Sequence, residues 1–106
     1  MENKDILFFE LEENRNKQVE LKDELNHMIK GHVNILYRNG KGYYYLTYRD
    51  GNKINNDYLG PVGKSDLTDV FNKLRIREDY KKQLKQLKIR EKEIKKEIKA
   101  KKKDDI

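Results

Sequence analysis

The sequence contains no cysteine and has few apolar residues. Without cysteine the chain forms no disulfide, no thiolate zinc site and no iron–sulfur cluster, and it has no cysteine nucleophile. The longest purely apolar run, residues 6–9, is far shorter than the roughly 20 residues that cross a bilayer as a helix. We therefore expect a cytoplasmic protein, suited to a reducing compartment, with no membrane partner.

Apolar residues make up 35% of the 106 residues, and charged residues make up 42%. A typical soluble domain has about 45–50% apolar and about 25% charged residues. So little apolar material does not fill a thick core, but it is enough for the narrow apolar stripes of long helices. The length predicts a single domain over residues 1–106.

Positive charge is concentrated towards the C-terminus. The net charge is +6, yet residues 73–103 hold fifteen Lys/Arg against five Asp/Glu, whereas residues 1–30 hold five against eight. A field of this sign attracts phosphate polymers. The same lysines are also typical of an ordinary solvated helix surface, so charge alone leaves both interpretations open.

Two segments have the alternating 4-3 spacing of helices that pack along a seam. The first, residues 5–30, is predicted to end at Gly31, because glycine reaches the left-handed conformation without steric cost. Its seam positions are Leu7, Leu11, Asn14, Gln18, Leu21, Leu25 and Met28. The second, residues 65–102, is predicted to begin with Ser65 as its N-cap. Its later seam positions are Tyr80, Leu84, Leu87, Glu91, Ile94 and Ile98.

The first seam needs a partner helix, because two of its middle positions are polar. The order helix, sheet, helix favours antiparallel pairing of the two helices as a coiled coil, with attraction between an acidic first helix and a basic second one. A parallel homodimeric coiled coil through residues 80–98 is the alternative. The sequence is therefore compatible with a monomer or a homodimer.

Between the helices, residues 32–59 change to the period of two that is typical of strands. Residues 39–42 form a cluster of turn-forming residues, and Asp50-Gly51 is a strong hairpin signal of the type I′ turn. Gly60-Pro61 ends the third strand. The prediction is a three-stranded antiparallel meander, and the fold class is α+β.

The alternation of the strands divides their side chains between two faces. One face is expected to hold Val33, Ile35, Tyr37, Tyr44, Leu46 and Tyr48. The other is expected to hold Asn34, Arg38, Tyr43, Tyr45, Thr47, Arg49, Lys53 and Asn55. The second set is rich in side chains that bind phosphates and base edges and that stack on bases. Tyrosines could equally pave a thin sheet, since each brings a large apolar area with a polar tip.

The run Tyr43–Lys53, closed by residues 58–61, resembles a family of short uncharacterised bacterial, archaeal and phage proteins. Their core reads Y-Y-Y-L-x-Y-R-x-G-x-K followed by Y-L-G, and many are encoded near mobile elements. The resemblance implies a helix–meander–helix fold and no assigned function; the cysteine pair of some members is absent here. More loosely, the meander is similar to the arm-type three-stranded DNA-binding domains of phage integrases, which favours nucleic acid as a partner.

The residues that would signal an enzyme or a cofactor site are missing. Residues 60–65 differ from a phosphate-binding loop, which needs a glycine where this chain has Tyr58. His27 and His32 lack a third ligand, so we expect no metal site. No set of nucleophile, base and orienting group is visible, and we expect neither an enzyme nor a bound cofactor.

The leading hypothesis is a small non-enzymatic protein of phage or mobile-element type that binds DNA or RNA, alone or within a ribonucleoprotein such as a CRISPR effector. The candidate nucleic-acid-binding residues are Arg38, Tyr43, Tyr45, Arg49 and Lys53 on the sheet, and Lys81, Lys85, Lys88, Lys92, Lys95 and Lys99 on the second helix. The alternatives are a protein inhibitor of a host nuclease or defence complex, of anti-CRISPR type, and a coiled-coil scaffold.

Overall fold

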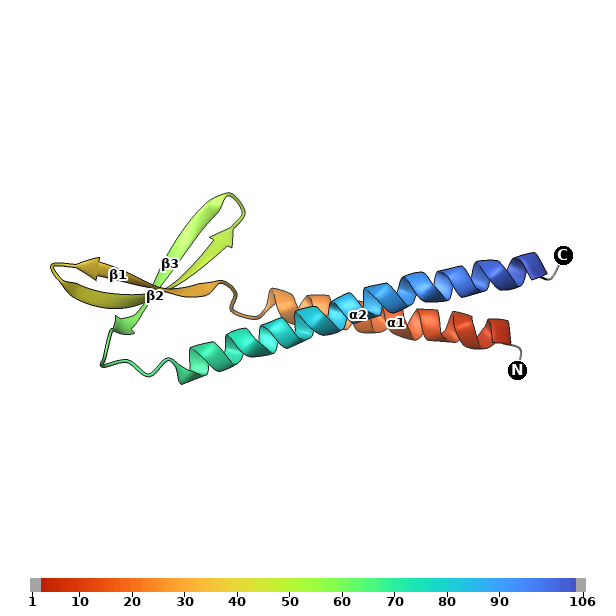
Figure 1. Ribbon diagram of the computed structural model, residues 1–106, viewed down its shortest axis with the longest axis horizontal. Coiled ribbons are helices and arrows are strands. Elements are labelled where there is room, and N and C mark those ends of the chain that lie inside the picture. The colour runs from red at the N-terminus through yellow and green to blue at the C-terminus, as the bar shows by residue number, and fades with distance from the viewer. Residues whose placement is uncertain (1–2, 105–106) are drawn as a thin grey trace. The chain divides into compact units, whose positions relative to one another are not determined.

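The computed structural model describes residues 3–104 and contains two helices and three strands (Figure 1). In chain order they are α1 (Asn3–Asn26), β1 (His32–Arg38), β2 (Lys41–Asp50), β3 (Lys53–Pro61) and α2 (Thr68–Asp104). The predicted α+β fold is confirmed. The chain forms two compact units: α1 with α2 from Asp79 onward, here called the helical unit, and residues 28–78, here called the sheet unit. The prediction of a single domain over the whole chain stays a prediction.

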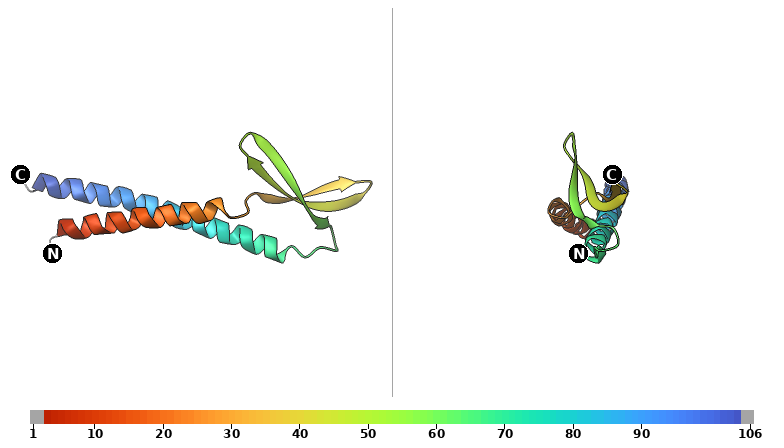
Figure 2. Two further views of the ribbon diagram at one scale, coloured as in Figure 1. Left: turned by 180° about the vertical axis from the view of Figure 1, so that it is seen from behind. Right: turned by 90° about the vertical axis from the view of Figure 1, so that its left-hand side faces the viewer.

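In the helical unit, α1 and α2 run antiparallel, so that the start of α1 meets the end of α2 (Figures 1 and 2). Leu7 and Leu11 of α1 form a buried cluster with Ile94 and Ile98 of α2, and Ile94 has no exposed surface. These are seam residues of both predicted helices, so the expected antiparallel pairing is present within one chain. Supercoiling as a coiled coil and a homodimer through residues 80–98 stay predictions.

The two polar seam positions of α1 form a buried network against α2. The Asn14 side-chain amide donates a hydrogen bond to the main-chain carbonyl of Leu87 at 2.9 Å. The Gln18 amide donates to Asn14 Oδ1 at 2.7 Å and to a carboxylate oxygen of Glu91 at 3.3 Å. Among the described residues, no buried side-chain polar atom lacks a partner. The polar positions therefore fix which part of α2 faces the middle of α1.

The first helix ends at Asn26, earlier than the predicted residue 30. The main-chain N–H of His27 donates to the Glu24 carbonyl at 3.1 Å, and its ring Nδ1 lies 2.7 Å from the Asp23 carbonyl oxygen. These contacts reach two of the last four carbonyls of the helix. Gly31 has a positive φ of 109°, but a Cβ there would overlap the carbonyl oxygen of Thr47. Gly31 is needed because the chain passes close to β2 at this point. It lies five residues beyond the end of α1, so the prediction that it ends the helix was wrong.

The second helix begins at Thr68, three residues later than predicted. Ser65 is not its N-cap: its hydroxyl donates to the Pro61 carbonyl at 2.9 Å and packs on Gly60, where a Cβ would overlap it. The Asp66 carboxylate instead accepts from the main-chain N–H of Thr68 at 3.0 Å and from its hydroxyl at 2.6 Å. Asp66 thus satisfies a donor at the start of α2, and these hydrogen bonds lower the pKa of its carboxyl.

The sheet is an antiparallel meander in the order β1-β2-β3, as predicted. Asn39 and Gly40 link β1 to β2 with positive φ at both residues (55° and 78°), which is the requirement of a type I′ turn. In the second hairpin the loop is Gly51-Asn52. Of these two residues, Gly51 has a positive φ (61°) and Asn52 does not. That pattern fits type II′ rather than the predicted type I′ at Asp50-Gly51.

One extra residue interrupts the pairing of β2 with β3. Tyr45 pairs with Tyr58 while Tyr44 pairs with Gly60, so Leu59 is the inserted residue of a β-bulge. A bulge increases the local twist of a sheet, and the two hairpins point in clearly different directions (Figures 1 and 2). Pro61 prolongs β3 two residues beyond the predicted end at residue 59.

Candidate nucleic-acid interfaces

Six lysines occupy one side of α2. Each follows a seam residue directly, and together they form what we call the lysine flank: Lys81, Lys85, Lys88, Lys92, Lys95 and Lys99. All six side chains are exposed. The spacing of 4-3-4-3-4 places them on one face over about 27 Å at 1.5 Å rise per residue. The structure therefore brings the helical part of the predicted site together as a stripe.

The opposite flank of α2 is the one that meets the carboxylates of α1. Arg90 forms a two-bonded ion pair with Glu10, with N–O distances of 2.8 and 3.0 Å, and also contacts Glu93 and Glu97 at 3.2 Å. The hydrogen bond from Arg90 lowers the pKa of Glu10. Glu10 belongs to the positions that precede the α1 seam, where most of the acids of this helix lie: Glu10, Glu13, Glu20 and Glu24.

On the side of the lysine flank, the seam residue Glu91 is the carboxylate that the neighbouring cations and amide contact. It accepts from Arg15 at 3.1 Å and from Gln18, and Lys95 lies 3.8 Å away. Hydrogen bonds from Arg15 and Gln18 lower the pKa of Glu91. Among the side chains that the structure describes, no ion pair involves the remaining flank lysines Lys85, Lys88, Lys92 and Lys99. The expected attraction between an acidic and a basic helix thus uses arginines and leaves these lysines available.

The strand register assigns the side chains of the sheet to its two faces. Directly paired residues share a face, and the pairs Asn34–Tyr45, Tyr45–Tyr58 and Thr47–Asn56 define what we call the Tyr/Arg face. It comprises His32, Asn34, Leu36, Arg38, Lys41, Tyr43, Tyr45, Thr47, Arg49, Ile54, Asn56, Tyr58 and Pro61. Four of the five predicted sheet residues, Arg38, Tyr43, Tyr45 and Arg49, are therefore on one face.

Lys53 and Asn55 are on the other face, so their predicted placement was wrong. Lys53 pairs with Asp50 and Asn55 with Tyr48. The reason is the two-residue loop, which makes the residues on either side of it direct partners and so fixes which positions of β3 share a face with β2. By the same rule Tyr58 and Asn56 join the Tyr/Arg face. Neither residue, nor Lys41, was among the predicted site residues, although the length of the loop indicates the face of Tyr58 and Asn56.

Side chains on the Tyr/Arg face contact one another across all three strands. The Tyr58 ring lies against Tyr45, with centroids 5.5 Å apart in an edge-on arrangement, and 6.2 Å from Tyr43. Asn34 donates to the Thr47 hydroxyl at 2.7 Å, and that hydroxyl donates to Asn56 Oδ1 at 2.7 Å. The face thus carries an aromatic group and, beside it, an amide–hydroxyl–amide chain.

Charge is divided between the two faces of the sheet. The Tyr/Arg face carries three strongly basic side chains (Arg38, Lys41 and Arg49) and, over the described strands, no carboxylate. Asp50 and Asp57 lie on the opposite face. There, burial, a hydrogen bond to Asp57 and the charges of Asp57 and Asp50 raise the pKa of Tyr48.

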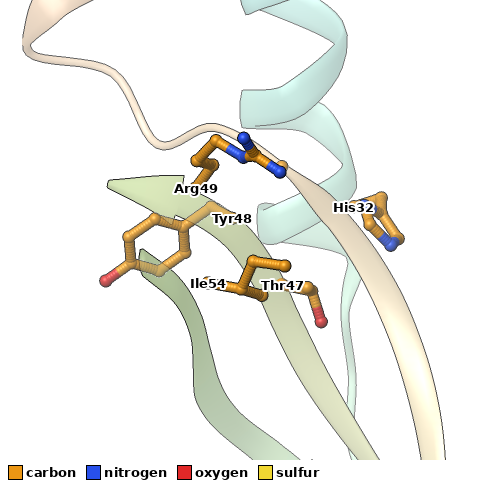
Figure 3. A pocket seen from close by; sticks show the side chains of 6 residues that line it. His32, Thr47, Tyr48, Arg49 and Ile54 are labelled. Carbon is orange, nitrogen blue, oxygen red and sulfur yellow. The ribbon is translucent and has the colours of Figure 1, made fainter. Parts of the chain in front are cut away.

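A shallow pocket of about 290 Å³ opens at one end of the Tyr/Arg face (Figure 3). It is lined by Gly31, His32, Thr47, Tyr48, Arg49 and Ile54. His32 lies on β1 at one side of it, while Thr47 and Arg49 come from β2 (Figure 3). Gly31 and Thr47, whose close approach brings β2 near the start of β1, both line it. The pocket is cationic through Arg49 and small enough for one chemical group of a larger ligand.

Within residues 3–104, no group of three or more His, Cys, Asp or Glu side chains could hold a metal ion. Neither helix, over its described residues, is apolar enough along its length to cross a membrane. Comparisons with family models, with curated proteins and with solved structures return no significant match. The two cationic surfaces, the lysine flank and the Tyr/Arg face, are the features that bear on function.

Proposed function

We propose that this chain is a non-catalytic nucleic-acid-binding protein that contacts the phosphate backbone through the lysine flank. The observation that carries the proposal is the uniform composition of that flank. All six positions that follow the seam residues from Tyr80 to Ile98 are lysine, and all six are exposed. An ordinary solvated helix surface mixes the two signs of charge, as the other flank of α2 does with Asp79, Arg90, Glu93 and Glu97.

A stripe of exposed lysines, uniform in sign, suits a phosphate polymer better than it suits a folded protein surface. Phosphates repeat along a nucleic acid, and each neutralised phosphate releases condensed counterions, which drives binding at low salt. The lysine stems can lie along the helix pair while the ammonium groups reach outward. The acids of α1 are mostly on the other flank, so they do not compete for these ammonium groups.

The Tyr/Arg face supplies a second surface of the same sign. Its arginines and lysine can contact phosphates, and its tyrosines and amides can contact bases. The lysine flank and the Tyr/Arg face belong to different units, so each is tested by its own variants. The expected loose similarity of the meander to arm-type DNA-binding domains would agree with a nucleic-acid partner.

The test is the salt dependence of binding, measured by fluorescence anisotropy with labelled duplex DNA, duplex RNA and single strands. In duplex DNA, the triple variant Lys85→Gln, Lys88→Gln, Lys92→Gln should flatten the log–log salt slope by up to about 2.7, since each lost phosphate contact contributes about 0.9. The control is Lys17→Gln, Lys53→Gln, Lys73→Gln, which removes the same charge from positions outside both surfaces and should leave the slope nearly unchanged.

Two results would overturn the proposal. One is a lack of binding to any of these nucleic acids at low salt, which leaves a protein inhibitor of a nuclease or defence complex, or a scaffold, as the explanation. The other is an equal effect of the flank variant and the control, which assigns binding to net charge rather than to the flank. Melting curves followed by circular dichroism show that each variant is folded.

A further inference from the structure

The aromatic group of the Tyr/Arg face is accessible. Tyr58 is 57% exposed although it contacts both Tyr43 and Tyr45. The edge-on contact with Tyr45 holds the Tyr58 ring in one orientation at little cost in mobility, because a tyrosine has only two side-chain torsions. A ring that is both fixed and exposed is suited to stacking on a flat ligand.

The amide–hydroxyl–amide chain beside the rings leaves hydrogen-bonding atoms available to a ligand. Thr47 uses its hydroxyl to accept from Asn34 and to donate to Asn56. Within residues 3–104, Oδ1 of Asn34 and the side-chain amide nitrogen of Asn56 form no hydrogen bond. An amide presents both a donor and an acceptor, the pair of functions that a base edge needs.

Cationic groups lie at both ends of this arrangement. Arg38 pairs with Lys41 at the first hairpin, and Arg49 lines the pocket near the second. Lys41 and Arg49 are eight residues apart along β2, or about 27 Å at 3.4 Å per residue, and the tyrosines and amides lie between them. The order along the strand is thus cation, rings, amides, cation.

We propose that the Tyr/Arg face binds an unpaired stretch of nucleic acid, with Tyr58 and Tyr45 stacking on bases, Asn34 and Asn56 bonding base edges, and Arg49 holding a phosphate at the pocket. This inference rests on the proposed function and names its ligand as single-stranded. A duplex hides the faces of its bases, whereas aromatic side chains on an open sheet stack on splayed bases of either sugar type. The absence of carboxylates from this face, against two on the opposite face, agrees with a phosphate-bearing occupant.

The experiment compares the full chain and its variants on oligo-dT, oligo-U and a duplex of the same length. Tyr58→Leu should weaken binding to the single strands by about 5- to 150-fold, the range of a lost base stack, and should leave the salt slope and duplex affinity unchanged. Tyr58→Phe should retain binding. The matched control is Tyr37→Leu, because Tyr37 is 74% exposed on the opposite face and should have no effect.

The outcomes separate this inference from the proposed function. If the flank lysines set the salt slope but Tyr58→Leu and Tyr37→Leu behave alike, the single-strand inference is wrong and the proposed function stands. If Tyr58→Leu acts selectively but the flank variant does not, the sheet binds and the lysine flank does not. Equal affinity for duplex and single strands also overturns the inference. A preference between oligo-dT and oligo-U, with Tyr58 required for both, supports it and identifies the favoured sugar.

Discussion

The helical unit and the sheet unit are built on opposite physical principles. Of the buried apolar side chains that the structure describes, six belong to the helical unit, whereas Leu46, at 6% exposure, is the one in the sheet unit. The helices are stabilised by side-chain packing along one seam, and the meander depends on its main-chain ladder and on a few close approaches at glycine. A three-stranded sheet with one buried side chain is marginal by itself.

The same two units agree in how they distribute charge. In each, carboxylates gather on one side: beside Arg90 in the helical unit, and on the face of Asp50 and Asp57 in the sheet unit. The opposite sides, the lysine flank and the Tyr/Arg face, are cationic and exposed. Packing differs between the units while charge segregation recurs, and this recurrence is what favours a ligand over a merely solvated surface. Four predictions test these differences in packing and in the use of polar and charged groups.

The largest effect is expected in the helical core. Ile94 has no exposed surface and contacts a cluster of leucine and isoleucine, so Ile94→Ala should cost about 2–5 kcal/mol of unfolding free energy through lost burial and a cavity. In the sheet unit, Ile54→Ala at a 62% exposed position should stay within about 0.5 kcal/mol. Chemical denaturation followed by helical circular dichroism measures both. Similar costs for the two variants would remove the contrast.

The second effect is expected at a glycine of the sheet unit. Gly31→Ala should cost about 2–4 kcal/mol, since its Cβ must displace the Thr47 carbonyl and φ is positive. Gly63→Ala separates the two causes, because Gly63 also has positive φ (85°) but nothing lies within 4 Å of the added Cβ. It should cost about 1–2 kcal/mol. Tyrosine fluorescence reports the sheet, because six of the seven tyrosines are in strands. Equal costs would mean that the close approach is unimportant.

The elements were predictable because their signals are local. Seam spacing found both helices, including the buried positions Ile94 and Ile98, and alternation with turn residues found three strands. The helix ends were predicted wrongly because Gly31 and Ser65 have partners in other parts of the sheet unit. Gly31 approaches Thr47 of β2, and Ser65 contacts Gly60 and the Pro61 carbonyl. No local pattern contains such a contact.

The candidate site was predictable in part for the same reason. The lysine stripe follows from spacing alone, but which flank would meet the acids of α1 depends on antiparallel pairing, which brings like flanks together. On the sheet, Tyr58 and Asn56 follow from the two-residue loop, whereas the bulge at Leu59 lies where Gly60-Pro61 was expected to end the strand. Lys53 was placed on the wrong face because the alternation of β2 was continued unchanged through the loop. The two-residue loop instead makes Asp50 and Lys53 direct partners, which share a face.

The third prediction concerns the buried polar network. Asn14→Ala removes the donor to Leu87 and leaves a buried Gln18 with one partner fewer, which should cost about 1–3 kcal/mol. The double variant Asn14→Leu, Gln18→Leu should be neutral or more stable, yet less specific, because a wholly apolar seam tolerates other registers and partners. Light scattering would show a rise in oligomer for the double variant. A strictly monomeric and less stable double variant would contradict this role.

The smallest effect is expected at the exposed ion pair of Glu10 with Arg90. The hydrogen bond from Arg90 lowers the pKa of Glu10 in the folded state, so the carboxylate contributes stability above its unfolded pKa of about 4.3 and loses it as pH falls through the lower folded value. Glu10→Gln should therefore melt slightly below the parent protein near neutral pH, and the difference should shrink as pH falls below the unfolded pKa and disappear once pH is below the lowered folded-state pKa of Glu10. Glu13→Gln is the control, since Glu13 lies on the same flank and forms no ion pair among the described residues.

High salt should shrink the difference in melting temperature between Glu10→Gln and the parent at neutral pH, because the Glu10–Arg90 pair is partly exposed to screening. A gap that persists at low pH would mean that Glu10 acts through packing rather than through charge.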